Sequence, residues 1–470
     1  MNPQNPLREA TSGSCGWKRY SVLRWSAHRR SAWILLRKLT KAFSFRILSA
    51  FTRSVTYLTV TASNESPKAM ERRSSIRSWA MGSLLSFWAN SLLADAVVLR
   101  NWGIETYTEI QRTLRVPGTN LFAETASLNG TISGGLNGRA FVWPEATQFR
   151  VFNTLTQILP GTYRTQLRSF SDELHAAYWN NGYRSGAGGG DRFYDDNAHV
   201  AVALMEAYRL TLDVTYLDRA KQTYAFVKQG EDSVAGGGIY FKQADFTSKD
   251  AISTLQGARS ATMLFRSTGE QSYLADATRL LTWAETHIQL ADGLFYQRWS
   301  VATNQPSGVE LVNAAGIGIS LNLELYDATG LPRYLSEAQR IATRSLNRYF
   351  DASTGRINDE GYWAFELVDA LDNLYLHDRN PLWLNKVEIA LTWLHANKRD
   401  PNGHYDVFWG RNGAQVGALA SWNLNEQASV ARAYLYTSTV PEPSVSALSL
   451  FGILLELRRR RRPLASGLLR

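Results

Sequence analysis

The sequence repeats a helical pattern at intervals of roughly 60 residues, and this repeat limits the possible folds more than any other feature. Residues 211–217, 268–274 and 329–335 align without gaps, 57 and 61 residues apart, and each ends in Tyr-Leu. The last two segments begin with Thr-Gly, and glycine suits the left-handed residue that ends a helix. The spacing therefore predicts a chain of helical hairpins.

Each aligned segment lies between two amphipathic patterns. The preceding helices, rich in small residues, are expected at residues 197–210, 252–267 and 314–328. The following helices, which carry bulkier side chains, are expected at residues 216–228, 273–288 and 334–349. Further helices are expected at residues 163–179, 362–377, 382–396 and 425–436. About five or six hairpins would therefore fill residues 97–440.

The alternation of small-residue and bulkier helices favours a closed ring over an open solenoid. An inner ring crowds its helices together, whereas an outer ring keeps one face on solvent. We therefore predict an all-α fold, an (α/α)6 toroid. Loops rich in glycine and aromatic residues recur on one side of the repeat, so we expect a groove at one end of the ring. These loops comprise residues 236–241, 292–296, 354–358 and 402–405.

Charge and motifs exclude several classes of protein. The net charge is +10, but residues 97–440 carry 30 basic and 35 acidic side chains, so the sequence does not support a nucleic-acid partner. The single cysteine, Cys15, excludes a CxxC metal or redox site. The glycine run at residues 186–190 lacks the Lys-Ser/Thr of a phosphate loop, and His-Glu-x-x-His and Gly-x-Ser-x-Gly are absent. We predict neither a metal nor a cofactor.

The two ends of the chain have the composition of targeting segments. Basic residues after Met70, an apolar run over residues 79–93 and Ala94-Asp95-Ala96 match a secretory signal peptide at residues 70–96, although a buried helix would also fit. Residues 1–69 contain many arginines and serines without sustained periodicity, and we expect a disordered upstream extension there, with the true start at Met70.

Residues 441–470 form a tripartite end. Val440-Pro441-Glu442-Pro443-Ser444 is followed by an apolar stretch over residues 445–457 and by five arginines, Arg458 to Arg462. This end resembles the PEP-CTERM sorting signals of Gram-negative bacteria. The resemblance implies exosortase-type sorting machinery as a partner, transient membrane contact, and export to the cell surface or medium. An ordinary C-terminal membrane tail is the alternative.

Two adjacent carboxylates, Asp195 and Asp196, stand at the start of the first repeated helix. Like charges at close range resist joint ionisation, while the helix N-terminus stabilises an anion, so the pair can hold one proton at neutral pH. Neighbouring helical side chains lie roughly 5–6 Å apart, close to the separation of about 5–5.5 Å used in retaining glycoside hydrolysis. The pair therefore fits glycosidase chemistry, although a solvated helix cap is the alternative.

The surrounding sequence resembles glycoside hydrolase family 76, the endo-α-1,6-mannanases. The similarity rests on residues 194–198 (Tyr-Asp-Asp-Asn-Ala), 206–211, 237–240 (Gly-Gly-Ile-Tyr) and 249–252. It implies an (α/α)6 fold, a polysaccharide substrate, and Asp195 and Asp196 as nucleophile and general acid/base. His199 stands where the family usually has a bulky aromatic residue, and Asp250 replaces an expected asparagine.

Other residues of the repeated loops and of the dyad segment are candidates for substrate binding. Aromatic faces stack on sugar rings, although core packing is equally compatible with such residues. The candidates are Trp143, Tyr194, Asn197, Tyr240, Phe295, Trp363 and Trp409. His199 is a further candidate sugar ligand or an interior histidine.

Two other functions remain open for the same fold. Other α/α toroids act on uronic acids or epimerise sugars, and epimerases need a histidine pair beside the substrate, whereas the histidines here are scattered among repeat positions. A surface protein that binds glycans without hydrolysing them is the second alternative.

Overall fold

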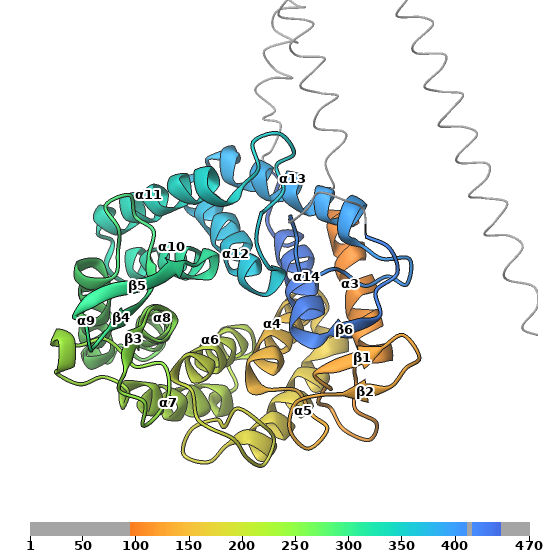
Figure 1. The fold of residues 1–470 in the computed structure, drawn as a ribbon, viewed down its shortest axis with the longest axis horizontal. Helices are drawn as coiled ribbons and strands as arrows, with labels where there is room; N and C mark the ends of the chain where they lie inside the picture. The colour runs from red at the N-terminus through yellow and green to blue at the C-terminus, as the bar shows by residue number, and fades with distance from the viewer. Residues whose placement is uncertain (1–94, 411–415, 443–470) are drawn as a thin grey trace, which may run out of the picture. The chain divides into compact units, whose positions relative to one another are not determined.

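Six inner helices surrounded by six outer helices form a closed ring (Figure 1) in the computed structural model, which describes residues 95–410 and 416–442. The inner helices are α4 (Val142–Ile158), α6 (Tyr194–Thr211), α8 (Ala251–Thr268), α10 (Val312–Thr329), α12 (Gly361–Asp378) and α14 (Leu424–Thr437). The outer helices are α3 (Ala96–Thr113), α5 (Pro160–Tyr178), α7 (Val214–Lys228), α9 (Gln271–His287), α11 (Pro332–Tyr349) and α13 (Pro381–Lys398). The expected all-α (α/α)6 toroid is confirmed.

The ring closes through contacts between the two ends of the described chain. Each inner helix packs against the inner helices on either side, and α14 packs against α4. Five hairpins pair consecutive helices, whereas the sixth pair joins α14 to α3. The last inner helix therefore depends on the first outer helix for its cover.

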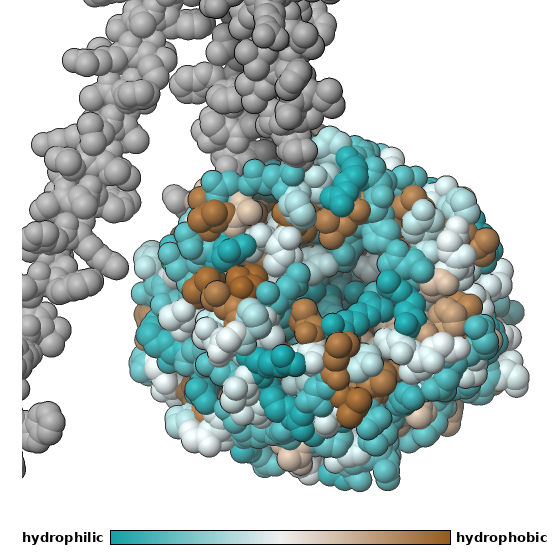
Figure 2. Space-filling model, turned by 180° about the vertical axis from the view of Figure 1, so that it is seen from behind, coloured by the Kyte–Doolittle hydropathy of each residue, from teal (hydrophilic) through white to brown (hydrophobic). Residues whose placement is uncertain are grey.

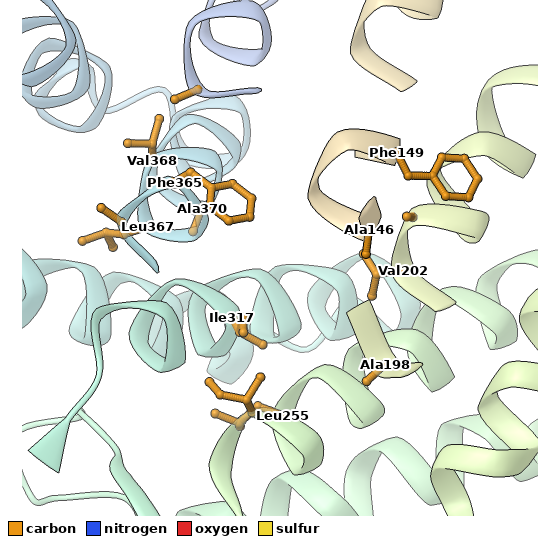
Figure 3. Close-up of a cluster of buried hydrophobic side chains, with 14 of the residues drawn as sticks. Ala146, Phe149, Ala198, Val202, Leu255, Ile317, Phe365, Leu367, Val368 and Ala370 are labelled. Atoms are coloured by element: carbon orange, nitrogen blue, oxygen red, sulfur yellow. The ribbon is translucent and has the colours of Figure 1, made fainter. Parts of the chain in front are cut away.

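Small side chains let the inner helices approach one another. Figure 3 shows part of the buried core, in which Ala146, Ala198 and Val202 lie between α4 and α6. Gly316 of α10 shows how close the approach is, because a Cβ atom there would lie 2.5 Å from the backbone carbonyl of Glu366 in α12. The sequence needs glycine at this position so that α10 and α12 can touch.

Two small antiparallel sheets lie at the end of the ring where the inner helices begin (Figure 1). One has the order β2-β1-β6, from Ile132–Ser133, Thr125–Ser127 and Ser421–Asn423. The other has the order β3-β4-β5, from Ser248–Asp250, Tyr296–Ser300 and Gln305–Glu310. Because β1 pairs with β6, the first sheet also ties the two ends of the ring together.

The expected helices agree with the observed ones to within three residues at each end, but the sequence did not predict α3, α4 or the strands. In α4, 14 of 17 residues are buried, and several of them are polar. A helix that is buried on every side lacks the alternation of apolar and polar residues, with a period of 3.6, from which a helix is predicted.

Several expectations fall outside the described residues. These are the upstream extension over residues 1–69, nearly all of the signal at 70–96, and the apolar and arginine-rich parts of 441–470. At the edge of this region, the Asp95 carboxylate caps α3 by accepting from the Val98 backbone N–H at 2.9 Å. Among the described helices, none has the length and apolar character needed to cross a membrane.

Candidate active site

A cleft of about 750 Å³ opens at the end of the ring where the inner helices begin. Its walls combine the first turns of α4, α6, α12 and α14 with the loops that precede them. The lining residues include Trp143, Asp195, Asp196, Tyr362, Asn425 and Glu426, and from the loops Glu124, Phe141, Asp191 and Phe241. The groove expected at one end of the toroid is therefore present.

A second, charged cavity of about 330 Å³ lies at the opposite end of the ring. It is lined by residues near the C-terminal ends of all six inner helices. Figure 2, which views the ring from behind, shows this face hollowed near its middle. The six inner helices are therefore parallel, and one end of the ring carries their N-termini and the cleft.

The start of α6 places the carboxyl groups of Asp195 and Asp196 in the cleft. The buried Asn197 side chain holds the preceding loop, since its amide donates to the Phe193 carbonyl at 2.7 Å and its oxygen accepts from the Tyr183 N–H at 2.6 Å. Tyr194 stacks on Phe226 with the ring centroids 5.0 Å apart. These contacts fix the first turn, and the two aspartates remain partly exposed to the cleft.

The protein surroundings favour protonation of the pair. Burial, followed by the charges of Asp196 and Asp250, raises the pKa of Asp195 well above its ordinary value. Burial also raises the pKa of Asp196 to about 7. The backbone N–H groups of residues 195 and 196 donate to the Asp195 carboxyl and favour its ionised form. The pair therefore holds a shared proton near neutral pH.

Two further carboxyl groups face the cleft from the side of α14. Glu124 accepts hydrogen bonds from the Phe141 N–H at 2.8 Å and the Asn423 amide at 3.2 Å, and burial raises its pKa. Burial and the charge of Asp406 raise the pKa of Glu426 to about 7. None of the described residues that line the cleft is basic. The cleft is therefore suited to a neutral ligand with many hydroxyl groups.

Aromatic rings supply the apolar part of the cleft. Trp143 and Tyr362 meet edge to face, with ring centroids 5.5 Å apart and planes at 85°. Phe141 is exposed at the rim of the cleft. Aromatic side chains beside carboxyl groups are the usual components of a sugar-binding surface, because the rings stack on C–H faces and the carboxyls bind hydroxyls.

Comparison with known proteins identifies the family. The sequence model of glycosyl hydrolase family 76 matches residues 119–363, which is more than half of the chain. The chain belongs to glycoside hydrolase family 76. A search of the curated proteins gave no significant match.

Solved structures share the ring. The GH76 α-mannanase BT2949 of Bacteroides thetaiotaomicron is 26% identical, with a TM-score of 0.67 over 76% of this chain and 97% of that chain. An α-1,6-mannanase of Salegentibacter sp. is 17% identical, with a TM-score of 0.63 over 73% of this chain and all of that chain. The cellobiose 2-epimerase of Bacillus thermoamylovorans is 12% identical, with a TM-score of 0.59 over 73% and 98%. The last two show the fold alone.

The structure brings only some of the expected site residues of this family 76 chain together. Asp195, Asp196 and Trp143 line one cleft. Asn197 lies beneath them and is fully buried, so it positions the loop and cannot contact a ligand directly. Tyr194 is likewise a packing residue against Phe226, which corrects its expected role in substrate binding.

None of the four remaining aromatic candidates lines the cleft, and the burial of three of them corrects the expectation that these three contact a sugar. Phe295 is fully buried in the core beside Gly318. Tyr240 is buried with its ring 3.4 Å from the Lys249 ammonium group. Trp409 is buried against Gly361, and Trp363 is half-buried and does not line the cleft. Proximity to a glycine-rich loop in sequence did not indicate exposure.

Sequence reasoning missed Glu124, Tyr362, Asn425 and Glu426. The last three occupy the first turns of inner helices, as the dyad does. Aligning the starts of all inner helices would have found them, because parallel helices bring equivalent positions to the same end of a ring. Glu124 precedes β1 and carries no sequence signal of its own.

The two positions that depart from the family pattern are both buried. His199 lies one turn beyond Asp195 and Asp196 on α6, with its Nδ1 atom 3.2 Å from the Gln256 amide nitrogen, and burial lowers its pKa to about 4. Asp250 caps α8 by accepting from the Ser253 N–H at 2.9 Å, and burial raises its pKa. His199 is therefore neutral near pH 7.

No group of histidine, cysteine, aspartate and glutamate side chains within residues 95–410 and 416–442 is arranged to hold a metal ion.

Proposed function

We propose that this chain is an exported glycoside hydrolase that cleaves α-mannan-like polysaccharide at α-1,6-mannosidic bonds with retention of configuration. The observation that carries the proposal is the placement of the adjacent carboxyl groups of Asp195 and Asp196 in a cleft that has aromatic walls and no described basic residue. Membership of family 76 supports the hydrolase class.

Two relatives support the substrate class. The Bacteroides protein that is 26% identical is described as an α-mannanase. The Salegentibacter protein was solved as an inactive variant, with two adjacent aspartates replaced by asparagine, in complex with α-1,6-mannotriose. An inactive enzyme that still holds its sugar supports a catalytic role for neighbouring aspartates.

The reaction proceeds in two steps with one proton on the pair. In the reactive state the shared proton lies on Asp196, because backbone N–H groups donate to the Asp195 carboxyl and favour its ionised form. The Asp195 carboxylate attacks the anomeric carbon while Asp196 donates its proton to the glycosidic oxygen. The bond between the anomeric carbon and that oxygen breaks, and the released sugar leaves as an alcohol. Asp196, now ionised, takes a proton from water. The water oxygen then forms a bond to the anomeric carbon, and the ester bond to Asp195 breaks. Two inversions give net retention.

The electrostatics of the cleft argue against an acidic substrate. A uronate polymer would bring carboxylates towards Asp195, Asp196, Glu124 and Glu426, with no described basic side chain in the lining to pair with them. A sugar epimerase would need two histidines beside the substrate, and no described histidine lines the cleft. Both features favour hydrolysis of a neutral glycan.

Export and membrane contact form part of the same proposal. The signal-like residues 70–96 direct export, and the apolar residues 445–457 with the following arginines hold the protein transiently at a membrane before sorting. Nearly all of residues 70–96 and all of residues 445–462 lie outside the described residues, so the support for both segments comes from the sequence.

The test is incubation of the chain with linear α-1,6-mannan, a neutral β-glucan and a uronate polymer. Mass spectrometry of the products and NMR of the first anomeric proton should show manno-oligosaccharides released from the first substrate only, initially as the α-anomer. Initial release of the β-anomer would overturn the retaining mechanism. Binding of mannan without any product would favour the glycan-binding alternative.

A further inference from the structure

We propose that the rim of the ring where the inner helices end lies on the surface of an anionic lipid bilayer, so that the cleft faces away from the membrane. This inference rests on the proposed membrane contact of residues 445–457. It adds which surface of the ring would contact the same bilayer. The rim consists of the six places where an inner helix ends and an outer helix begins.

Five of these six turns expose large apolar side chains. The exposed residues are Val97, Leu159, Leu212, Val214, Leu331 and Leu382. Leu212 is 72% exposed, and Val214 and Val97 are 62% and 63% exposed. Figure 2, which shows this face, has hydrophobic patches distributed around the central hollow. Apolar side chains around one rim are suited to insertion at the headgroup boundary of a bilayer.

Leu212 occupies a position where the other two repeats have glycine. Gly269 and Gly330 end α8 and α10 with φ of +76° and +69°, and Leu212 ends α6 in the same left-handed region with φ of +58°. A leucine in this region is strained by roughly 1 kcal/mol or more. The fold therefore accepts strain to present an apolar side chain to solvent at the tip of this turn.

The rim also carries three arginines, Arg164, Arg333 and Arg379, for which the described residues show no ion pair within 4 Å, although Arg333 donates to the Tyr334 hydroxyl at 2.6 Å and its charge acts on Glu285. Arg164 donates to the Thr211 carbonyl, and Arg333 and Arg379 lie over the rings of Tyr334 and Tyr375 at 4.4 and 5.7 Å. Several acids of the rim already have partners within the ring. Glu270 pairs with Lys221, Asp327 pairs with Arg266, and Asp213 pairs with Arg168. Three available cations beside exposed leucines match the phosphates of anionic lipids.

The described chain ends at the same rim. Helix α14 ends at Thr437, and the last described residues, 438–442, follow it at the turn between α14 and α3. Only Pro443 and Ser444 separate Glu442 from residue 445. Three residue steps span at most about 11 Å. If residues 445–457 enter a bilayer, this rim is the nearest part of the ring to its surface.

The orientation has a consequence for the substrate. The cleft is at the end of the ring that carries the inner-helix N-termini, opposite to the rim. A protein resting on this rim would present Asp195 and Asp196 to polysaccharide in the medium and leave the cleft unobstructed by lipid.

The test uses the full chain on vesicles of phosphatidylethanolamine and phosphatidylglycerol. A fluorophore is attached to single cysteines, Leu212→Cys or Leu331→Cys on the rim and Leu128→Cys or Val309→Cys on the cleft side, in a Cys15→Ser background. The cleft-side controls are matched, since Leu128 and Val309 are 55% and 65% exposed. Lipids with brominated acyl chains quench only fluorophores that contact them, and quenching is expected at Leu212 and Leu331 alone.

A second pair of variants tests the contribution of the rim to affinity. The triple substitution Leu212→Ser, Leu331→Ser and Leu382→Ser should weaken vesicle binding by about tenfold or more, and Leu128→Ser with Val309→Ser should change it by less than about twofold. Vesicle binding without quenching at the rim, or with quenching at the cleft side, would overturn the orientation but leave the membrane contact standing. Absence of vesicle binding would overturn both. Mannan hydrolysis, measured in the same samples, reports separately on the hydrolase proposal.

Discussion

Replacing Asp196 with asparagine should stabilise the folded protein at neutral pH while abolishing catalysis. Burial raises the pKa of Asp196 from 3.8 to about 7, so the folded state resists ionisation that the unfolded chain undergoes freely. A group with a raised folded-state pKa gives its full stabilisation below its unfolded pKa and loses it as pH rises through the folded value. The contribution of Asp196 to the stability of the folded wild-type protein therefore falls between about pH 4 and pH 7.

The size of the effect follows from the pKa shift. A shift of about three units corresponds to about 4 kcal/mol at 1.36 kcal/mol per unit. Because the carboxyl group is partly exposed to the cleft, water screens the charge and reduces this value. We expect the Asp196→Asn protein to exceed the wild type in free energy of unfolding by about 1–3 kcal/mol at pH 7–8, and by close to zero near pH 4.

The assay is urea unfolding of both proteins across this pH range, with the difference in the free energy of unfolding plotted against pH. Asp245→Asn is the matched control, because hydrogen bonds from the Thr247 hydroxyl at 2.6 Å and its backbone N–H at 3.1 Å hold the pKa of Asp245 below its ordinary value. That variant should lose stability relative to wild type as pH rises. An Asp196→Asn protein that is no more stable than wild type at pH 8 would refute the reasoning.

Four other perturbations test separate parts of the structure. Arg150 is buried against Glu366 at 2.7 Å and Asp369 at 2.8 Å, so Arg150→Ala should destabilise the fold by about 3–5 kcal/mol in urea unfolding, and retention of wild-type stability would contradict this. Gly316→Ala forces α10 away from α12 and should cost about 1–3 kcal/mol by the same measurement. Trp143→Ala should raise the KM for mannan more than it lowers kcat, and a change in kcat alone would argue against stacking. The rate of mannan hydrolysis should fall as pH rises above about 7, because the Asp196 proton is lost, and a rate that is flat to pH 9 would exclude this proton donor.

Much of the fold could be predicted from the sequence, because each helical hairpin of the ring repeats the same turn segment and the same pair of helix patterns. The aligned segments at 211–217, 268–274 and 329–335 marked the turns, and the small-residue helices before them became the inner ring. The helices α3 and α4 were not predicted, because α4 is buried on all sides and α3 lies outside the aligned repeats. Strand β1 pairs with β6, which lies far along the chain. Such strands depend on distant partners, so the neighbouring sequence contains no pattern that predicts them.

The candidate site was only partly predictable for a related reason. The dyad was visible because Asp195 and Asp196 lie in a segment, residues 194–198, that resembles family 76, whereas a single aromatic residue carries no such motif. Tyr362 faces the cleft and Trp363, the next residue, does not, because consecutive helical positions differ by about 100° in direction. Phe295 and Trp409 are aromatic residues near glycine-rich loops, as expected of sugar contacts, but both are buried in the core. Which side chains of a helix face the cleft depends on the rotation of that helix about its own axis. Tertiary packing sets this rotation, and the local sequence does not reveal it.

The central claim is that the neighbouring carboxyl groups at the start of α6 perform the hydrolysis. The most direct measurement is the release of reducing ends from α-1,6-mannan by the wild-type, Asp195→Asn and Asp196→Asn proteins, with Asp191→Asn as the control. Asp191 is exposed at the same cleft and pairs with Lys242 at 3.0 Å. The account predicts that each dyad variant stays folded and loses about a thousandfold or more in rate, while the control keeps its activity. A dyad variant that hydrolyses mannan at the wild-type rate would contradict it.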